Sequence, residues 1–271
     1  MAQQGSRIKL VAVDLDGTLL NDAKQVAEQT VNALRCLKDV KVVIASARPP
    51  RSVRHIYQQL GLDTLQINYN GALIWSEPEK RAVFHQPIEA NVGWEIIDFA
   101  RDMYEEVLVS CEVADRWFTD RDDHTYTTET GKLFKPDVIG PLAEWARQPI
   151  TKLMLLGEPI ITVRLEAMIA KQFGQRVSVV RTDKDLIQIM DSRVSKATSL
   201  KRVAASYGIA MSDVMAIGDA PNDVAMLQVS GVAIAMDNAD PLVKEHAHWI
   251  APSNNDHGVH AALVKYGVCP A

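Results

Sequence analysis

Short apolar runs alternate with amphipathic stretches at both ends of the chain. Residues 8–13 are mostly apolar and stop at Asp14, and residues 40–45 repeat this pattern. Such runs are typical of strands buried on both faces of a parallel sheet. Between them apolar side chains recur at helical spacing, so the beginning of the chain predicts strand, helix, strand. Further apolar runs lie at 65–67, 214–217 and 232–235, and further helical stretches lie at 51–60, 222–228 and 241–246.

This alternation predicts an α/β fold whose core is a Rossmann-like, doubly wound parallel sheet. The middle of the chain departs from the pattern, because several strands follow one another with few helices between them. Such a run predicts an α+β domain on an open, largely antiparallel sheet, inserted into the core. We place the core at residues 1–83 and 190–271 and the inserted domain at 84–189. The polar stretch 119–135 is interpreted as an exposed excursion of the inserted domain and not as a site.

Composition narrows the class of protein. The chain has 271 residues, 47% of them hydrophobic and 23% charged, which is typical of globular proteins. A net charge of −5 gives no sign of the basic face that nucleic acid or an anionic membrane requires. The first apolar run is too short for a signal peptide or a membrane span, and the three cysteines form no paired motif. We therefore expect a cytoplasmic protein.

Two carboxylates stand where the first buried run ends, in the segment DLDGT at residues 14–18. Ligands of open α/β sheets bind just beyond the carboxyl ends of the strands, so Asp14 and Asp16 occupy the position expected of a site. Gly17 permits an unusual backbone conformation, and successive amides at such a turn can hold an anion. Taken alone, the segment is also compatible with a plain polar turn.

A second polar turn, GDAPND at residues 218–223, follows another buried run. Asp219 would add a third carboxylate at a strand end, and Pro221 suits the opening of a helix. Carboxylate oxygens indicate a hard divalent cation, and Mg²⁺ is usually held by one or two carboxylates together with a substrate phosphate. The alternative is that Asn222 or Asp223 only caps the helix.

Two weaker signals suit a phosphate. Ser46, directly after the second predicted strand, offers a hydroxyl beside the backbone amide of Ala47, and Arg48 offers a forked donor. Lys196 stands near the start of a predicted helix and would neutralise charge on an attacked phosphoryl group. A helix cap and a solvated surface lysine are the competing interpretations of Ser46 and Lys196.

Taken together and in this order, the four segments resemble the motifs of the haloacid dehalogenase superfamily, and most closely its Cof-type phosphatases with an inserted α/β cap of type IIB. The step Asn70-Gly71-Ala72 and the segment 253–259 resemble Cof-type sequences as well. The match covers nearly the whole predicted core. The inserted domain matches only in length and position.

The resemblance implies a role for each matching residue. Asp14 would be the nucleophile, and Asp16 the acid and base for the leaving group and water. Mg²⁺ would bind side-chain oxygens of Asp14 and Asp219 and the backbone carbonyl of Asp16. The phosphoryl group would be held by the residues of the two phosphate loops and by the lysine: Leu15, Gly17, Ser46, Ala47 and Lys196. Asn222 and Asp223 would orient the lysine and the waters of the metal, and Arg48 and Asn70 are expected near the leaving group.

The chain departs from the usual family pattern at Ala47, where glycine is common, so we expect the geometry of this phosphate loop to differ. The expected function is Mg²⁺-dependent hydrolysis of small phosphate monoesters, either sugar phosphates or a phosphorylated cofactor, through an aspartyl-phosphate intermediate. Two alternatives stay open: a sugar phosphomutase with the same aspartate chemistry, and a non-catalytic protein that binds a phosphorylated metabolite. The expected partner is a small phosphorylated metabolite, with no nucleic acid and no membrane.

Overall fold

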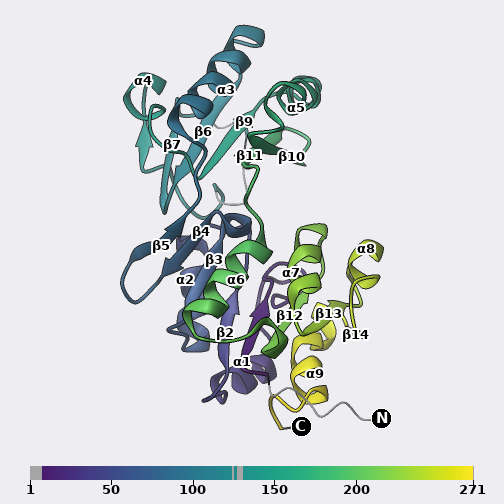
Figure 1. The fold of residues 1–271 in the computed structure, drawn as a ribbon. Coiled ribbons are helices and arrows are strands. Elements are labelled where there is room, and N and C mark those ends of the chain that lie inside the picture. Colours follow the sequence, from purple (N-terminus) through teal and green to yellow (C-terminus); the bar gives the residue numbers. More distant parts are fainter. Residues whose placement is uncertain (1–7, 124, 127–130, 271) are drawn as a thin grey trace. The chain divides into compact units, whose positions relative to one another are not determined.

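The chain forms two compact units, which we describe separately from a computed structural model of residues 8–123, 125–126 and 131–270 (Figure 1). Unit 1 holds the chain up to Val83 and from Ser195 onward, and unit 2 holds Phe84–Val194. The sequence places the second boundary earlier, at 189/190. The difference arises because strand β11 (Leu186–Asp191) pairs as far as Asp191 inside the sheet of unit 2.

The central sheet of unit 1 has the predicted parallel, doubly wound arrangement. Within the described residues its strand order is β14-β13-β12-β1-β2, and every neighbouring pair is parallel. The chain passes from β1 to β2 on one side of β1, whereas β12 lies on the other side. The strand order therefore reverses between β1 and β12, which is where open α/β sheets bind ligands. These strands are β1 (Leu10–Val13), β2 (Lys41–Ile44), β12 (Val214–Gly218), β13 (Val232–Met236) and β14 (Trp249–Ala251).

The helices of unit 1 begin and end at residues suited to those positions. Helix α2 has Pro50 in its first turn and is followed by Gly61, whose φ of 66° is left-handed. Ser195 caps α6 by accepting a hydrogen bond of 3.1 Å from the backbone N–H of Thr198. The helices are α1 (Glu28–Arg35), α2 (Pro50–Leu60), α6 (Lys196–Ser206), α7 (Val224–Val229), α8 (Pro241–Lys244) and α9 (Gly258–Lys265), with short 3₁₀ turns at Tyr69–Gly71, Met211–Asp213, Pro221–Asp223 and Asn254–Asp256.

A small antiparallel sheet, of which the sequence predicts only the first strand, follows α2. It has the order β3-β4-β5, with β3 at Leu65–Asn68, β4 at Leu73–Ser76 and β5 at Arg81–His85. The turn before β5 is held by the carboxylate of Glu77, which accepts hydrogen bonds from the Trp75 indole at 3.0 Å and from Arg54 at 2.7 Å. Strand periodicity does not identify the side chains that make these two hydrogen bonds.

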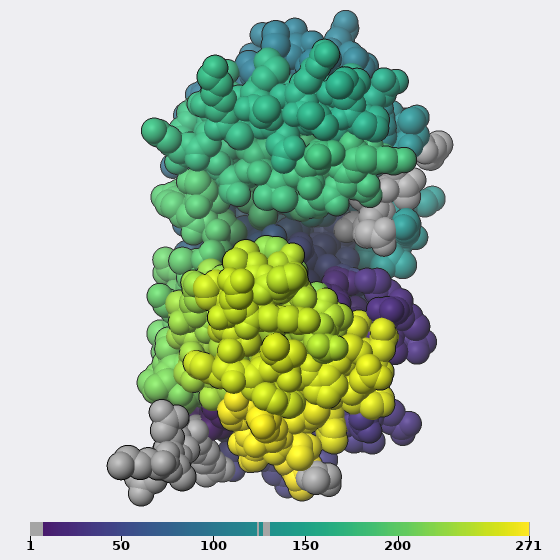
Figure 2. Space-filling model, turned by 90° about the vertical axis from the view of Figure 1, so that its right-hand side faces the viewer, coloured from purple at the N-terminus to yellow at the C-terminus, as the bar shows by residue number. Residues whose placement is uncertain are grey.

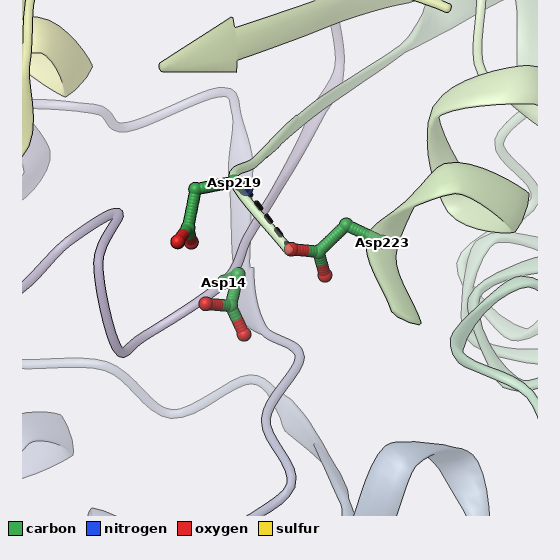
Figure 3. Close-up of side chains that lie close together, drawn as sticks. All are labelled: Asp14, Asp219 and Asp223. Carbon is green, nitrogen blue, oxygen red and sulfur yellow. Dashed lines mark hydrogen bonds between the residues drawn. The ribbon is translucent and has the colours of Figure 1, made fainter. Parts of the chain in front are cut away.

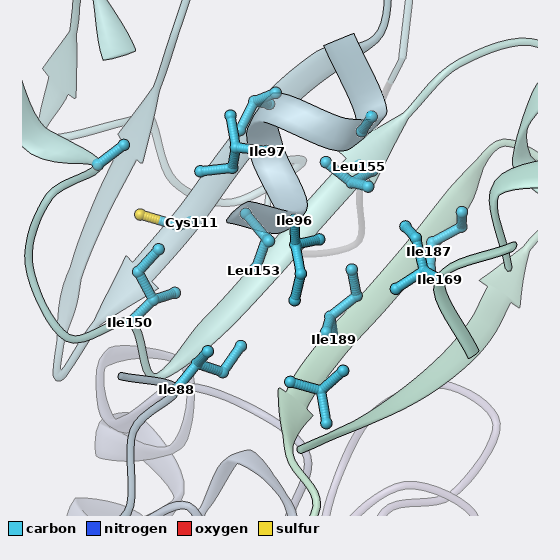
Figure 4. Packing of buried hydrophobic residues seen from close by; sticks show 14 of the residues in the cluster. Ile88, Ile96, Ile97, Cys111, Ile150, Leu153, Leu155, Ile169, Ile187 and Ile189 are labelled. Atoms are coloured by element: carbon cyan, nitrogen blue, oxygen red, sulfur yellow. The ribbon is translucent and has the colours of Figure 1, made fainter. Parts of the chain in front are cut away.

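Unit 2 is the predicted α+β domain. In the described part of this unit, the sheet order is β10-β11-β9-β6-β7-β8, antiparallel except for the pair β7 and β8. Alternate side chains of β6, β9 and β11 pack against helices α3 and α5 in one apolar cluster (Figure 4). The elements are α3 (Ala90–Met103), β6 (Leu108–Val113), β7 (Arg116–Thr119), β8 (Val138–Ile139), α4 (Leu142–Trp145), β9 (Lys152–Leu156), α5 (Pro159–Phe173), β10 (Val177–Asp183) and β11.

The other face of the unit 2 sheet carries a second, smaller apolar cluster. Leu108, Leu156 and Leu186 are buried there, and the side chains of Trp117 and Tyr126 pack against them. This face lies away from α3 and α5 because side chains of a strand alternate. Residues 119–135, interpreted from the sequence as an exposed excursion, supply Tyr126, so part of this stretch packs on the sheet.

Residues from Pro241 onward, coloured yellow, gather on one side of unit 1 (Figure 2). They include helix α9, which packs against β13 and β14. Among the described residues, no helix combines the length and the apolar character that crossing a membrane requires.

Candidate active site

Three carboxylates meet at the reversal point between β1 and β12 (Figure 3), and the ammonium group of Lys196 contacts two of them. Oxygen atoms of Asp14, Asp219 and Asp223 lie within 4.8 Å of one another. The Nζ atom of Lys196 donates hydrogen bonds to Asp14 at 2.5 Å and to Asp223 at 2.6 Å, and its side chain is fully buried. The strand ends thus bring together residues that lie far apart in the sequence.

Each of these side chains is placed by the end of an element. Asp14 follows β1, Asp219 follows β12, and Lys196 opens α6. The second carboxylate oxygen of Asp223 accepts hydrogen bonds from the backbone N–H groups of Asp219 and Ala220, at 3.0 and 3.1 Å. Asp223 therefore fixes both the lysine and the turn that carries Asp219.

Two glycines let these carboxylates approach the backbone. Gly17 has a φ of +79°, and a Cβ atom there would lie 2.3 Å from an oxygen of Asp219. A Cβ atom at Gly218 would lie 2.6 Å from the carboxylate of Asp223. A side chain at either position would displace a carboxylate, so the glycines are part of the site's geometry.

The site carries more negative than positive charge. Burial raises the pKa of Asp14 to about 8, an effect that Lys196 opposes and that the charges of Asp223 and Asp219 strengthen. Burial also raises the pKa of Asp219, although a hydrogen bond from Thr18 opposes it. The pKa of Lys196 is raised, because its two carboxylate partners outweigh its burial. When its three carboxylates are ionised, the cluster therefore carries more negative charge than Lys196 can neutralise.

The donor set fits a hard divalent cation. One oxygen of Asp14 accepts from Lys196, and one oxygen of Asp219 accepts from the hydroxyl of Thr18 at 2.6 Å. Among the hydrogen bonds of the described residues, both oxygens of Asp223 have protein donors. Asp14 and Asp219 are therefore better suited than Asp223 to share oxygen atoms with a cation.

Asp16 lies apart from this cluster, and two positively charged side chains donate hydrogen bonds to its carboxylate. Arg48 donates to both of its carboxylate oxygens, at 2.7 and 2.5 Å, and Lys24 donates at 2.9 Å. Burial acts to raise the pKa of Asp16, but the hydrogen bonds from Arg48 and Lys24 outweigh burial, so this pKa lies below its usual value. The Asp16 side chain is 41% exposed, which leaves it accessible to a ligand.

The remaining predicted site residues lie around the same strand ends. Ser46 is buried two residues after the end of β2, and its hydroxyl oxygen accepts a hydrogen bond of 3.1 Å from the backbone N–H of Arg48. Asn70 accepts a hydrogen bond of 2.9 Å from the side chain of Asn222. Leu15 is fully buried, and Ala47 is exposed. Arg48 thus contacts Asp16, and Asn222 contacts Asn70.

Three contributors were not singled out from the sequence. Thr18 fixes Asp219, Lys24 binds Asp16, and Asn238 donates a hydrogen bond of 2.8 Å to the backbone carbonyl of Gly17. Thr18 is the last residue of the DLDGT segment, so this motif could have identified it as a site residue. Lys24 and Asn238 reach the site from loops, where no spacing rule identifies a partner.

Comparison with known proteins gives one consistent family. The family model of haloacid dehalogenase-like hydrolases matches residues 11–263. A candidate phosphatase of Streptococcus pyogenes is 31% identical over 96% of this chain and 98% of its own length. A 5-amino-6-(5-phospho-D-ribitylamino)uracil phosphatase of Bacillus subtilis is 28% identical over 95% of this chain and 97% of its own.

Solved structures agree with this family. The crystal structure of a Thermotoga maritima protein superposes with a TM-score of 0.86 at 25% identity, covering 95% of this chain and 97% of that one. A haloacid dehalogenase-like hydrolase of Bacteroides thetaiotaomicron has the same fold, with a TM-score of 0.86 at 22% identity and coverage of 96% and 99%. The chain belongs to the haloacid dehalogenase-like hydrolases and is a Cof-type phosphatase of that family.

Proposed function

We propose that this phosphatase hydrolyses small phosphate monoesters with Mg²⁺, through an aspartyl-phosphate at Asp14. The observation that carries the proposal is the buried contact between Asp14 and Lys196 beside Asp219, at the reversal point of the sheet. A carboxylate in this position has a cation on one side and a second carboxylate on the other. This arrangement supports nucleophilic attack on a phosphoryl group once a metal offsets the repulsion between anions.

Asp14 and Asp219 would hold Mg²⁺ with side-chain oxygens, together with the backbone carbonyl of Asp16. When bound, the metal supplies charge neutralisation at the phosphoryl group and the carboxylates. Burial is the main cause of the raised pKa of Asp14 and Asp219, and neighbouring carboxylates add to it; a bound cation would offset both effects, which supports this assignment. Asp223 would act through Lys196 and the Asp219 turn without binding the metal directly.

In the first step an oxygen of Asp14 would form a bond to phosphorus as the bond from phosphorus to the leaving-group oxygen breaks. Asp16 would give a proton to that leaving oxygen. In the second step Asp16 would take a proton from water as the water attacks the phosphorus atom, which releases phosphate and restores Asp14. Arg48 donates to both oxygens of Asp16, and Lys24 shares one of them, so the acid role of Asp16 requires Arg48 to release an oxygen.

The phosphoryl group would be held by Lys196, by the Ser46 hydroxyl and by the backbone amides of Leu15, Gly17 and Ala47. Arg48 and Asn70 would lie near the leaving group. Asn222 supports this placement of Asn70 through their hydrogen bond. The substrate would be a small phosphorylated metabolite, because the net charge of −5 disfavours polyanions. A relative that acts on a phosphorylated ribitylaminouracil favours a phosphorylated cofactor or cofactor precursor as much as a sugar phosphate.

A screen of phosphorylated metabolites tests the proposal. The protein is incubated with each ester, with Mg²⁺ or with excess chelator, and free phosphate is measured. Release of phosphate that needs Mg²⁺ and is absent from Asp14→Asn supports the proposal. Conversion between sugar phosphate isomers without net release would instead indicate a phosphomutase. Equal release in chelator, or more than about 10% residual turnover in Asp14→Asn, would refute the proposed chemistry.

A further inference from the structure

The segment 253–259 resembles Cof-type sequences, but the chemistry proposed above gives it no role. It begins after β14 and ends in the first turn of α9. Two of its side chains, Asn254 and Asn255, contact the loop that follows the DLDGT turn (residues 14–18). These contacts join residues 232 to 234 positions apart in the sequence. The fold therefore places this segment beside the turn that carries the proposed nucleophile.

Asn254 is the central residue of these contacts, and it is buried, with 9% of its surface exposed. Its side-chain nitrogen donates hydrogen bonds to the backbone carbonyl of Leu20 at 2.9 Å and to the carboxylate of Asp22 at 3.3 Å. Its backbone N–H donates to the side-chain oxygen of Asn238 at 2.9 Å. A side-chain amide has two N–H groups, so Asn254 uses both on the loop after the DLDGT turn. This pairing favours one conformation of the loop, because another would leave buried donors without acceptors.

Asn238 connects Asn254 to the DLDGT turn. It follows β13 and is exposed, and its side-chain nitrogen donates a hydrogen bond of 2.8 Å to the backbone carbonyl of Gly17. Its side-chain oxygen accepts from Asn254, which fixes the orientation of the amide and turns the nitrogen toward Gly17. Gly17 has a φ of +79° and no side chain that restrains its backbone. The contact from Asn238 therefore restrains the most permissive residue of the turn.

The loop that carries Lys24 is held by the same segment. The backbone N–H of Asp22 donates to the side-chain oxygen of Asn255 at 3.1 Å, and the side-chain nitrogen of Asn255 donates to the Asp22 carboxylate at 2.9 Å. Hydrogen bonds from Asn255 and Asn254 lower the pKa of Asp22, so it accepts them as a carboxylate at neutral pH. Lys24 follows two residues later with a left-handed φ of 59° and donates to Asp16. The asparagines thus hold a second part of the site, the loop whose lysine contacts the proposed acid.

We propose that Asn238 and Asn254 are positioning residues for phosphoryl transfer, which hold the DLDGT turn in the shape that presents its backbone amides to the phosphoryl group. Neither side chain touches the substrate in this role. The inference rests on the proposed function, because the amides of Leu15 and Gly17 are assigned to the phosphoryl group there. These amides act most strongly in the transition state, where charge spreads over the phosphoryl oxygens, so a displaced turn lowers kcat more than it raises KM.

Three variants remove these contacts in different ways. Asn238→Asp keeps the shape and the acceptor of Asn238 but loses the donor to Gly17, and Asn238→Ala loses both. Asn254→Ala loses the donors to the loop and keeps its backbone N–H. We expect each to lower kcat for hydrolysis of p-nitrophenyl phosphate with Mg²⁺ about 3- to 10-fold, the contribution of a hydrogen bond, with KM changed less than about twofold. The control is Asn32→Ala, which changes an exposed asparagine of α1 and should match the wild type.

Two inhibitors separate this role from a general loss of folded protein. Orthovanadate adopts the five-coordinate geometry of a phosphoryl group under attack, whereas inorganic phosphate stays tetrahedral. In Asn238→Asp and Asn254→Ala with Mg²⁺, we expect the inhibition constant of orthovanadate to rise about 3- to 10-fold and that of phosphate less than about twofold. An unfolded fraction of the enzyme would lower the rate but would shift neither inhibition constant. Unchanged inhibition by orthovanadate in both variants would therefore overturn the inference.

Amide hydrogen exchange, followed by NMR, tests the turn without any hydrolysis. The N–H of Leu19 donates to the carbonyl of Asp14 at 3.2 Å, and that of Leu20 donates to the carbonyl of Leu15 at 2.9 Å. Because these hydrogen bonds close the turn, the exchange of the two amides reports whether the turn keeps its shape. We expect this exchange to be about 3 to 10 times faster in Asn254→Ala than in the wild type.

The outcomes separate this inference from the proposed function. If the wild type hydrolyses no phosphate ester while the two amides exchange faster in Asn254→Ala, the phosphatase proposal fails and the hold of the asparagines on the turn is supported. If the wild type is a phosphatase but the Asn238 and Asn254 variants match Asn32→Ala in kcat and in exchange, the positioning role is wrong and the phosphatase proposal stands.

Discussion

Replacing Lys196 by methionine tests whether this side chain holds the charged cluster together. The Lys196 Nζ atom lies 2.5 Å from Asp14 and 2.6 Å from Asp223, and the side chain has no exposed surface. Methionine has a similar length and no charge, so the change removes the cation while nearly filling its volume. The control is Lys201→Met, which removes an exposed lysine from the same helix α6.

The size of the effect follows from two opposing quantities. At 2.6 Å and an effective dielectric constant near 20, the contact of the ammonium with the Asp223 carboxylate is worth about 6 kcal/mol, and the contact with Asp14 adds a similar amount only where Asp14 is ionised. Desolvation of the ammonium costs several kcal/mol, so breaking such a buried pair lowers the free energy of unfolding by about 3–5 kcal/mol. We expect unit 1 of Lys196→Met to unfold at a lower urea concentration, and kcat to fall by about 10² or more, since the charge on the phosphoryl group loses its partner.

The stability deficit of Lys196→Met should also grow with pH. In the wild type the pKa of Asp14 is about 8, and loss of Lys196 raises it further. Below this pH both proteins keep Asp14 protonated. Above it only the wild type ionises Asp14, so the metal-free variant continues to lose up to about 1.4 kcal/mol for each pH unit. Urea midpoints measured from pH 6 to 9.5 check this expectation. Equal midpoints for Lys196→Met and Lys201→Met would refute the reasoning.

Three further outcomes are expected. Asp219→Ala should raise the Mg²⁺ concentration needed for half-maximal activity at least about tenfold, and an unchanged Mg²⁺ titration would contradict its role as a ligand. Asp16→Asn should slow single-turnover phosphoryl transfer by about 10² to 10⁴ for an alkyl phosphate but less for an activated aryl phosphate; equal slowing would exclude the acid role. The free energy of unfolding of the metal-free wild type should fall as pH rises from about 4 to about 8, because folding raises the pKa of Asp14 from 3.8 and so favours its protonated form in the folded state. Mg²⁺ should remove this loss. Urea midpoints measured with and without the metal check both expectations.

The sequence predicts the parallel core because each of its long strands is buried on both faces and reads as a continuous apolar run. It does not predict β4 or β5, which are as long as the core strands but meet at a turn that the Glu77 carboxylate holds. The sequence also does not predict that Lys196 is buried, since a lysine near a helix start is usually solvated. Motif order alone linked it to Asp14.

Contacts between loops were the least predictable part of the candidate site. The sequence places Arg48 near the leaving group but gives no sign that its guanidinium donates to both oxygens of Asp16. Lys24, whose own backbone has a φ of 59°, donates a hydrogen bond to the same carboxylate. Such contacts depend on loop conformations, and loops have no sequence periodicity that predicts which side chains form hydrogen bonds with each other.

The placement of β12 beside β1 has a consequence for synthesis of the chain. Leu10 pairs with Val214, so one edge of β1 has no partner until most of the protein has left the ribosome. At about 5–20 residues per second this interval lasts about 10 to 40 s. During it an apolar strand presents an open edge that can pair with other chains. The nascent protein should therefore depend on chaperones throughout the interval from the emergence of β1 to the emergence of β12.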